Sequence, residues 1–269
     1  MFIMSRPSQY PALALNRVKN IVSRLLLLVC ALITVNSLYA APQSPSTATI
    51  FGNWIIDSPE QITLLQLTRG QSYLYIQLNL IEPQNSVAEW GRIDIQQADV
   101  HFFPSYSSNQ QQGLVAYQIA HPKLHIALTV ESAQLVFSID TNGDSVADEQ
   151  HHYDITPSQS VYGVWHQLST PALSSLVLFD NGYYAMVKIN LHQDPQANEH
   201  FAQLQWGQFV LQQKQLIIEP MFNSHPQQTS SLLSAISSIV YQPNKQQLTL
   251  SFMMEANPDD IAINQRYRR

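Results

Sequence analysis

The chain of 269 residues carries little charge, with 13 Lys and Arg against 19 Asp and Glu and a formal net charge of −6. This acidic balance argues against nucleic acid and anionic membrane as partners, because basic surfaces bind both. The charged fraction of 12% is about half the usual share, so Gln, Ser and Asn supply much of the polar surface.

Residues 1–40 have the pattern of a secretory signal peptide. Basic residues lie ahead of the apolar run 25–35, and Ala40 precedes the expected cleavage site. The run is shorter than the roughly 20 residues that span a bilayer, although an uncleaved signal anchor is the alternative. We expect an exported protein, periplasmic or extracellular, with no transmembrane segment after cleavage and with a polar linker over 41–49.

Cleavage at this site changes the charge and removes the one cysteine. Residues 1–40 contain four basic and no acidic residues, so the mature chain has 9 basic and 19 acidic residues and a net charge of −10. Cys30 lies in the removed segment. The mature chain therefore depends on burial and backbone pairing rather than on disulfides.

A first β-rich unit is expected over residues 50–157, beginning at Gly52-Asn53-Trp54. Apolar runs at 62–67 and 73–80 flank Thr68-Arg69-Gly70, which is typical of a strand, a turn and a strand. Trp90-Gly91 then starts a second such block. Its return strand is expected to end at Pro104, because proline cannot donate a hydrogen bond to the ladder.

The segment from Asp140 to Glu149, DTNGDSVADE, is the sharpest local motif. Short calcium loops place oxygen ligands at positions 1, 3, 5 and 9 and a backbone carbonyl at position 7. The five residues at these places are Asp140, Asn142, Asp144, Val146 and Asp148. Ser145 stands where such loops have glycine. Calcium binding is therefore one interpretation, and an Asn-Gly hairpin turn is the other.

A second unit, expected over 158–256, repeats the landmarks of the first in the same order. Gly163-Val164-Trp165 matches Gly52-Asn53-Trp54, Gly182 matches Gly70, and Trp206-Gly207 matches Trp90-Gly91. The offsets are 111, 112 and 116 residues. Asn181-Gly182 between apolar runs predicts a hairpin turn whose two central residues both have positive φ.

Two C-terminal segments are harder to interpret. Residues 231–241 fit either a helix or a strand, and their alignment with the strand-like segment 114–119 favours a strand. Residues 257–269 are expected to form a polar tail without a strand.

The Gly-x-Trp pairs resemble the start of lipocalin-like (calycin-type) β-barrel domains. Several bacterial secreted versions continue with a hairpin like 179–187 and an aromatic-Gly strand like 205–211. The resemblance and the regular short strands predict an all-β fold. We expect two tandem antiparallel lipocalin-like barrels (or sandwiches), each of about 105 residues and roughly six to eight strands. The four tryptophans are expected to pack in the cores.

No nucleophile, metalloprotease or phosphate-loop signature occurs, so we expect a non-catalytic protein. The first hypothesis is an envelope role or the binding of a small apolar or amphipathic molecule in cavities. The predicted cavity residues are Tyr73, Tyr75, Tyr184 and Met186. The alternative is an adhesion module that recognises glycan or protein through aromatic loops around 101–106 and 221–222, with calcium stiffening unit one.

Overall fold

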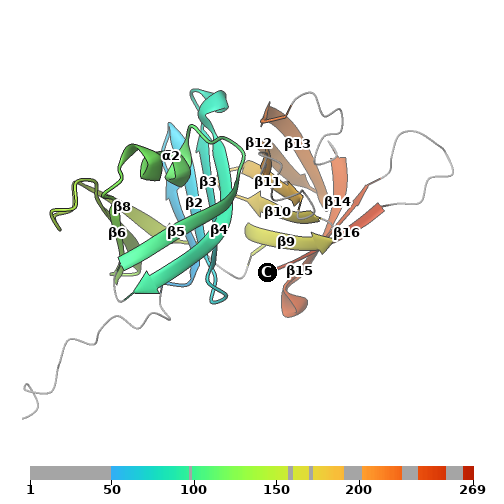
Figure 1. Ribbon diagram of the computed structural model, residues 1–269. Coiled ribbons are helices and arrows are strands. Elements are labelled where there is room, and N and C mark those ends of the chain that lie inside the picture. Colours follow the sequence, from blue (N-terminus) through green and yellow to red (C-terminus); the bar gives the residue numbers. More distant parts are fainter. Residues whose placement is uncertain are drawn as a thin grey trace, which may run out of the picture. The chain divides into compact units, whose positions relative to one another are not determined.

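The computed structural model describes residues 50–96, 99–156, 160–169, 172–190, 202–225, 236–252 and 263–269 (Figure 1). In this part of the chain, two closed antiparallel barrels of eight strands each follow one another. Both belong to one compact unit, Thr47–Arg269. The all-β fold of two tandem units is confirmed, and it fits the general architecture of lipocalin-like barrels. The predicted signal peptide and the whole predicted linker, 41–49, lie outside the described residues.

The first barrel is an up-and-down meander. Its strands are β1 (Gly52–Asp57), β2 (Gln61–Leu67), β3 (Ser72–Asn79), β4 (Val87–Gln96), β5 (Asp99–Ser107), β6 (His125–Glu131), β7 (Gln134–Asp140) and β8 (Glu149–Ile155). A 3-10 turn, η2 (Pro83–Asn85), precedes β4, and helix α2 (Gly113–Ala120) connects β5 to β6. Trp54 of β1 pairs with Ile155 of β8 and closes the barrel.

The second barrel repeats this order. Its strands are β9 (Gly163–Ser169), β10 (Ala172–Leu178), β11 (Tyr183–Asn190), β12 (Ala202–Gln212), β13 (Gln215–Asn223), β14 (Ile236–Gln242), β15 (Gln247–Phe252) and β16 (Ile263–Arg268), with η3 (Pro243–Lys245) before β15. Arg268 pairs with His166 of β9 to close it.

Strand β16 corrects the prediction of a strandless tail over 257–269. It pairs with β15 along its whole length and buries Tyr267 completely. Because Asn, Gln and Arg make up most of this strand, its sequence has few of the apolar residues by which a strand is usually predicted. The strand forms because the barrel needs an eighth member to satisfy the backbone groups of β9 and β15.

Helix α2 corrects the strand-like interpretation of residues 114–119. Leu114 is buried, and Tyr117, three residues later on the same side of the helix, packs against the core of the first barrel. Over eight residues the alternation of a strand and the spacing of a helix are hard to distinguish. For the aligned segment 231–241, residues 236–241 lie in β14, as favoured, and 231–235 lie outside the described residues.

Strands β5 and β13 continue through Pro104 and Pro220, contrary to the expectation that the prolines end them. The register shifts beside each proline, at Trp90/Gly91 and Trp206/Gly207. A Cβ atom at Gly91 would lie 2.2 Å from the carbonyl oxygen of Phe103. The repeated Gly and Pro therefore form a bulge where the two backbones approach too closely for a side chain.

The β2–β3 and β10–β11 turns align one residue differently from the sequence match. Gln71 has a φ of +57° and donates its N–H to the Thr68 carbonyl, while Gly182 has a φ of +87° and donates to Phe179. Gln71 is therefore the counterpart of Gly182, and Gly70 is the counterpart of Asn181. Of the Asn-Gly pair only Gly182 has positive φ, because this turn is not the two-residue type that was predicted.

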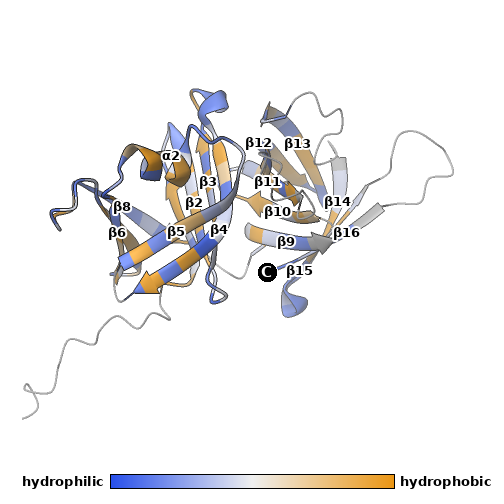
Figure 2. Cartoon of the chain, in the orientation of Figure 1, coloured by the Kyte–Doolittle hydropathy of each residue, from blue (hydrophilic) through white to orange (hydrophobic). Residues whose placement is uncertain are grey.

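Each barrel interior is filled mainly by the inward half of every strand, and Figure 2 shows the matching alternation of apolar and polar residues along β4 and β5. Trp54 and Trp165 occupy equivalent interior positions. The indole N–H of Trp54 donates to the Ile50 carbonyl and that of Trp165 to the Val161 carbonyl, both at 2.7 Å. These two tryptophans pack in the cores as predicted.

Trp90 and Trp206 pack elsewhere, in a third apolar cluster formed by the outer faces of the two barrels. This cluster joins outward residues of β2–β4 to outward residues of β9–β12. The indole N–H of Trp206 donates to the Ser86 hydroxyl at 3.0 Å. Strands β2, β3 and β10 are consequently buried on both faces, and each contains consecutive buried apolar residues, as at 64–65, 73–76 and 176–178.

Candidate functional site

A cavity of about 440 Å³ lies inside the first barrel, beneath helix α2. Its apolar wall consists of Ile56, Leu114, Ile126, Phe137 and Ile139. Three tyrosines, Tyr75, Tyr117 and Tyr153, add aromatic surface. Its main polar lining groups are Gln61, Thr63, Gln77, Gln111, Gln112 and His151.

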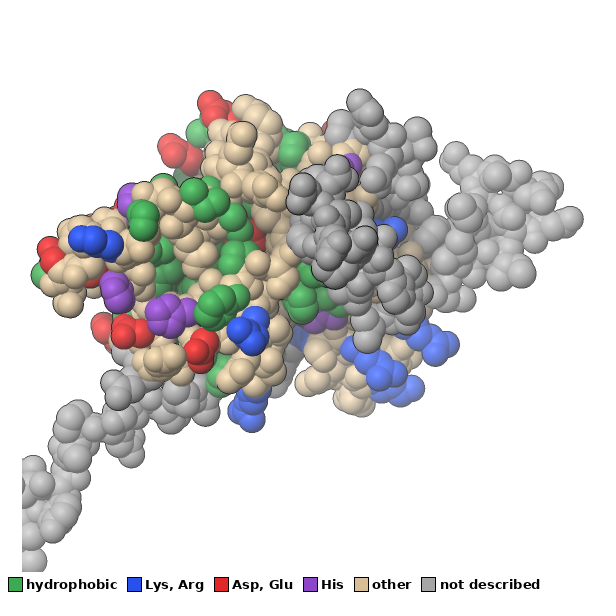
Figure 3. Space-filling view, viewed as in Figure 1, with side chains coloured by type: hydrophobic (Ala, Val, Ile, Leu, Met, Phe, Trp, Pro, Cys, Tyr) green, Lys and Arg blue, Asp and Glu red, His purple; other side chains and the backbone are tan. Residues whose placement is uncertain are grey.

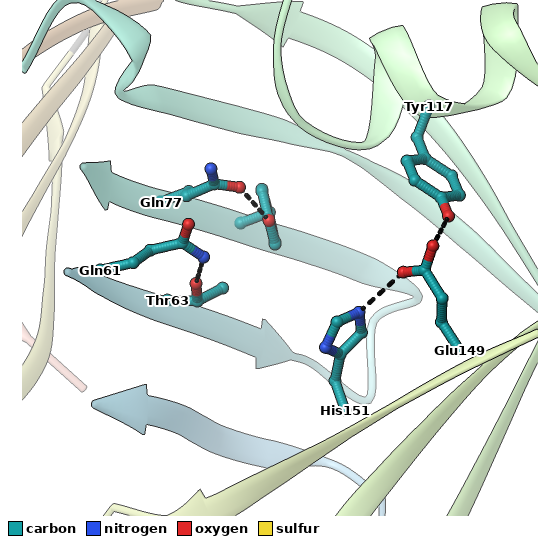
Figure 4. Close-up of polar contacts among 7 residues, drawn as sticks. Gln61, Thr63, Gln77, Tyr117, Glu149 and His151 are labelled. Atoms are coloured by element: carbon teal, nitrogen blue, oxygen red, sulfur yellow. Dashed lines mark hydrogen bonds and ion pairs between the residues drawn. The ribbon is translucent and has the colours of Figure 1, made fainter. Parts of the chain in front are cut away.

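Strands β2 and β3 bring polar side chains into a cavity whose other walls are largely apolar. The inward residues of β3 run from Tyr73 through Tyr75 to Gln77, and Thr63 of β2 pairs with Gln77. The Tyr75 hydroxyl donates to Gln77 Oε1 at 2.7 Å, and Gln61 Nε2 donates to Thr63 Oγ1 at 2.8 Å. Figure 4 shows both contacts on the neighbouring strands.

A second set of polar side chains links helix α2 to β8 beside the cavity. The Tyr117 hydroxyl donates to Glu149 Oε1 at 2.8 Å, and His151 Nε2 lies 3.5 Å from Glu149 Oε2 (Figure 4). Burial and the bond to Glu149 raise the pKa of Tyr117 to about 12. The Glu149 and His151 side chains are about half exposed. On the face drawn in Figure 3, charged side chains of the described part lie scattered among neutral ones.

Glu89 anchors the start of helix α2 from inside the barrel. It is completely buried, and its Oε1 accepts the backbone N–H of Val115 at 3.1 Å. Burial raises the pKa of Glu89 to about 7, although the N–H groups of Val115 and Leu114 act to lower it. Gly113, with a φ of +76°, leaves room for the carboxylate, since a Cβ there would lie 2.6 Å from Glu89 Oε1.

The four residues that were predicted to line cavities lie in different surroundings. Tyr75 lines the cavity, whereas the ring of Tyr73 packs edge-on against Phe102 at 5.0 Å between centroids. Tyr184 and Met186 are buried in the core of the second barrel, where the Tyr184 hydroxyl accepts a bond from Gln205 Nε2 at 2.8 Å.

Sequence reasoning missed helix α2, Gln77 and Glu89. For Glu89 a signal existed, because it precedes Trp90-Gly91 as Gln205 precedes Trp206-Gly207, so one repeat has an acid where the other has an amide.

The acidic loop between β7 and β8 folds around its own backbone. Asp140 accepts N–H bonds from Asn142, Gly143 and Ser145, at 3.1, 2.7 and 2.8 Å. Burial acts to raise the pKa of Asp140, but these bonds together lower it. Among the described residues no group of three or more His, Cys, Asp or Glu side chains is placed to hold a metal ion.

Calcium binding by Asp140, Asn142, Asp144, Val146 and Asp148 stays a prediction. A calcium-dependent rise in melting temperature that is lost in Asp148→Ala would support it. The Asp148 carboxylate also accepts bonds from the Thr141 hydroxyl and N–H.

The aromatic segments suggested for adhesion lie on strands rather than loops. Residues 101–106 belong to β5 and residues 221–222 to β13. Tyr106 and Phe222 pack against the cluster between the barrels, and the exposed large hydrophobic members are Phe103 and Met221.

No protein-family model matches the chain, and no curated protein matches it. One solved structure with a detectable match is the DNA polymerase III subunit beta from Pseudomonas aeruginosa. It is 10% identical, and the match covers 86% of this chain and 79% of that chain with a TM-score of 0.13. An overlap that low informs neither fold nor function. In the described part, no helix has the length and apolar character to cross a membrane.

Proposed function

We propose that the first barrel binds a small apolar or amphipathic molecule in the cavity beneath α2 and that the protein does so without catalysis. The observation that carries the proposal is the cavity itself, whose volume of about 440 Å³ lies within the range of roughly 300–1,000 Å³ of small-molecule sites. An apolar wall with a few polar groups is the usual lining of such sites.

The ionisable groups around the cavity support binding rather than chemistry. The Glu89 carboxylate is directed at the backbone of α2, and Glu149 is occupied by Tyr117 and His151. Neither arrangement pairs an acid or base with a nucleophile inside the cavity.

The proposal places this binding outside the cytoplasm, in the periplasm or the extracellular space, as the pattern of residues 1–40 indicates. N-terminal sequencing of the protein recovered after expression with its own leader tests this part. A mature N-terminus at Ala41 would support export, and an intact leader would contradict cleavage.

A neutral fluorescent probe, N-phenyl-1-naphthylamine, tests the binding site. We expect it to brighten at one site per chain in the wild-type protein. Ala116→Trp, on the cavity side of α2, should abolish this response because the indole fills the cavity.

Ile119→Trp is the matched control, since Ile119 lies on the same helix, is 73% exposed and does not line the cavity. It should keep the wild-type response. Equal probe binding by Ala116→Trp and Ile119→Trp, with both variants folded, would overturn the proposal.

A further inference from the structure

We propose that the ligand of this cavity is an uncharged amphiphile whose polar part consists of hydroxyl or amide groups, such as an alkyl glycoside or a long-chain alcohol or amide. This inference rests on the proposed function and specifies its ligand class.

The lining is polar, and its one potential cation among the described residues is the His151 imidazole. Among the described residues that form it, none is Lys, Arg, Asp or Glu, whereas four are glutamine: Gln61, Gln77, Gln111 and Gln112. An ionic head group that leaves water must find an opposite charge or lose much of its solvation energy. A hydroxyl or amide head group needs only hydrogen bonds, which these side chains provide.

The contacts on β2 and β3 leave a donor on Gln77 and an acceptor on Gln61. Gln77 accepts through Oε1 from Tyr75, so its Nε2 remains a donor; Gln61 donates through Nε2 to Thr63, so its Oε1 remains an acceptor. A hydroxyl or an amide can satisfy both groups, because each donates and accepts. A carboxylate accepts only and an ammonium group donates only, so neither can bond to both Gln77 Nε2 and Gln61 Oε1, although each can bond to one of them.

The acidic side chain that contacts the lining at Tyr117 and His151 is already engaged by both. Glu149 accepts from Tyr117 through one oxygen and lies 3.5 Å from His151 through the other. Because Glu149 is about half exposed and does not line the cavity, water and salt screen its charge, and it offers little attraction to a head group inside the cavity. This arrangement leaves hydrogen bonding as the means of recognising the polar end.

The second barrel indicates which substitution can change the preference of the first barrel for an uncharged head group. The β3 and β11 strands align from Tyr73 with Tyr184, so Lys188 stands where Gln77 stands, and its register partner is Ser174 in place of Thr63. Gln77→Lys therefore introduces a side chain that the same fold accepts at this position. The ammonium group would supply the counter-charge that the cavity of the first barrel lacks.

The experiment compares three ligands with eight-carbon skeletons, each below its micelle concentration: octyl β-glucoside, octanoate and octylammonium. Affinities are measured by isothermal titration calorimetry and by displacement of N-phenyl-1-naphthylamine at pH 8. We expect octyl glucoside to bind at least tenfold more tightly than either ion. Gln77→Lys should strengthen octanoate binding at least tenfold relative to octyl glucoside, and Ala116→Trp should abolish binding of all three.

The outcomes separate this inference from the proposed function. If the probe binds in the cavity but octanoate or octylammonium binds as tightly as octyl glucoside, the neutral-ligand inference is wrong and the binding site stands. If octanoate affinity is unchanged in a folded Gln77→Lys, the head group does not lie at Gln77 and the inference again fails. If neither the probe nor any of the three ligands binds, both are overturned.

Discussion

The interiors of the two barrels hold the same tyrosine beside different partners. In the second barrel, Gln205 Nε2 donates to the Tyr184 hydroxyl at 2.8 Å. In the first, Tyr73 and Glu89 occupy the same places, but the Tyr73 hydroxyl and Glu89 Oε2 have no hydrogen-bond partner in the described part of the chain. Glu89 bonds instead to the N–H of Val115 in helix α2.

This difference shows that the equivalent residues have different roles. Gln205 stabilises the core of the second barrel, whereas Glu89 holds helix α2 above the cavity of the first. An amide can donate to a tyrosine oxygen, whereas a carboxylate cannot. The first barrel therefore contains a buried acid whose pKa burial raises to about 7, with Tyr73 and Tyr75 as the titratable groups beside it. The same Glu89 side chain holds helix α2 in place above the proposed ligand site.

The largest expected effect comes from a feature that the two repeats share. Gly91→Ala and Gly207→Ala should each lower the free energy of unfolding by about 3 kcal/mol or more, because the new Cβ would lie 2.2 and 2.0 Å from backbone carbonyl oxygens. Chemical denaturation measures this loss. Gly70→Ala is the control, since its Cβ would meet only Thr68 Oγ1 at 3.7 Å. Equal stability of Gly91→Ala and Gly70→Ala would show that the bulge is not constrained.

Exchanging the interior partners tests the comparison directly. Glu89→Gln should raise the free energy of unfolding at pH 8 by about 2–3 kcal/mol, because an uncharged side chain replaces a buried carboxylate. Gln205→Glu should lower it by a similar amount at pH 8 and by less at pH 5. Urea unfolding at both pH values measures these changes.

The sign of the pH effect follows from the raised pKa. The folded protein holds the Glu89 proton more tightly than the unfolded chain, whose glutamate has an ordinary pKa of 4.5. The stability from this group is therefore fully present below pH 4.5 and is lost as the pH rises through about 7. A wild-type protein whose pH dependence matches that of Glu89→Gln over this window would contradict the assignment.

A smaller effect of opposite sign is expected from His166, which joins the two barrels. Its ring nitrogens lie 2.8 Å from Ser175 Oγ and from Gln66 Oε1, and burial lowers its pKa below 6.5. Its contribution is present above pH 6.5 and is lost as the pH falls through the lowered value. In the Glu89→Gln background, melting temperatures at pH 5 and 8 should differ less for His166→Gln than for the parent.

The smallest expected effect concerns the turns in which the repeats differ. Gln71 has positive φ where the second barrel has Gly182, and a left-handed conformation costs a residue with a side chain roughly 1 kcal/mol. Gln71→Gly should therefore stabilise the protein by up to about 1 kcal/mol, and Gly182→Gln should destabilise it by a similar amount. Thermal unfolding of both variants checks the pair, and a destabilised Gln71→Gly would refute the alignment of these turns.

The sequence alone was enough to identify the repeat, the all-β class and most hairpins. Those features depend on local chemistry: alternation in strands, glycine in turns, and Trp-Gly and Pro at corresponding places. The same local reasoning failed where partners distant in the chain decided the outcome. Gly91 and Pro104 form a bulge only because β4 and β5 pair, and Tyr267 belongs to a strand only because β15 and β9 lie on either side of it.

The cavity is another feature that partners distant in the chain decide. Sequence alternation places Tyr73, Tyr75, Tyr184 and Met186 on inward faces, but which of them meets empty space depends on how eight strands and α2 close around it. Glu89 anchors that helix through a bond between residues 26 positions apart. Local pattern thus determined the repeated β architecture of this protein, and long-range packing alone decided that the first barrel encloses a cavity beneath a helix, because volume and burial are properties of the assembled barrel rather than of any segment.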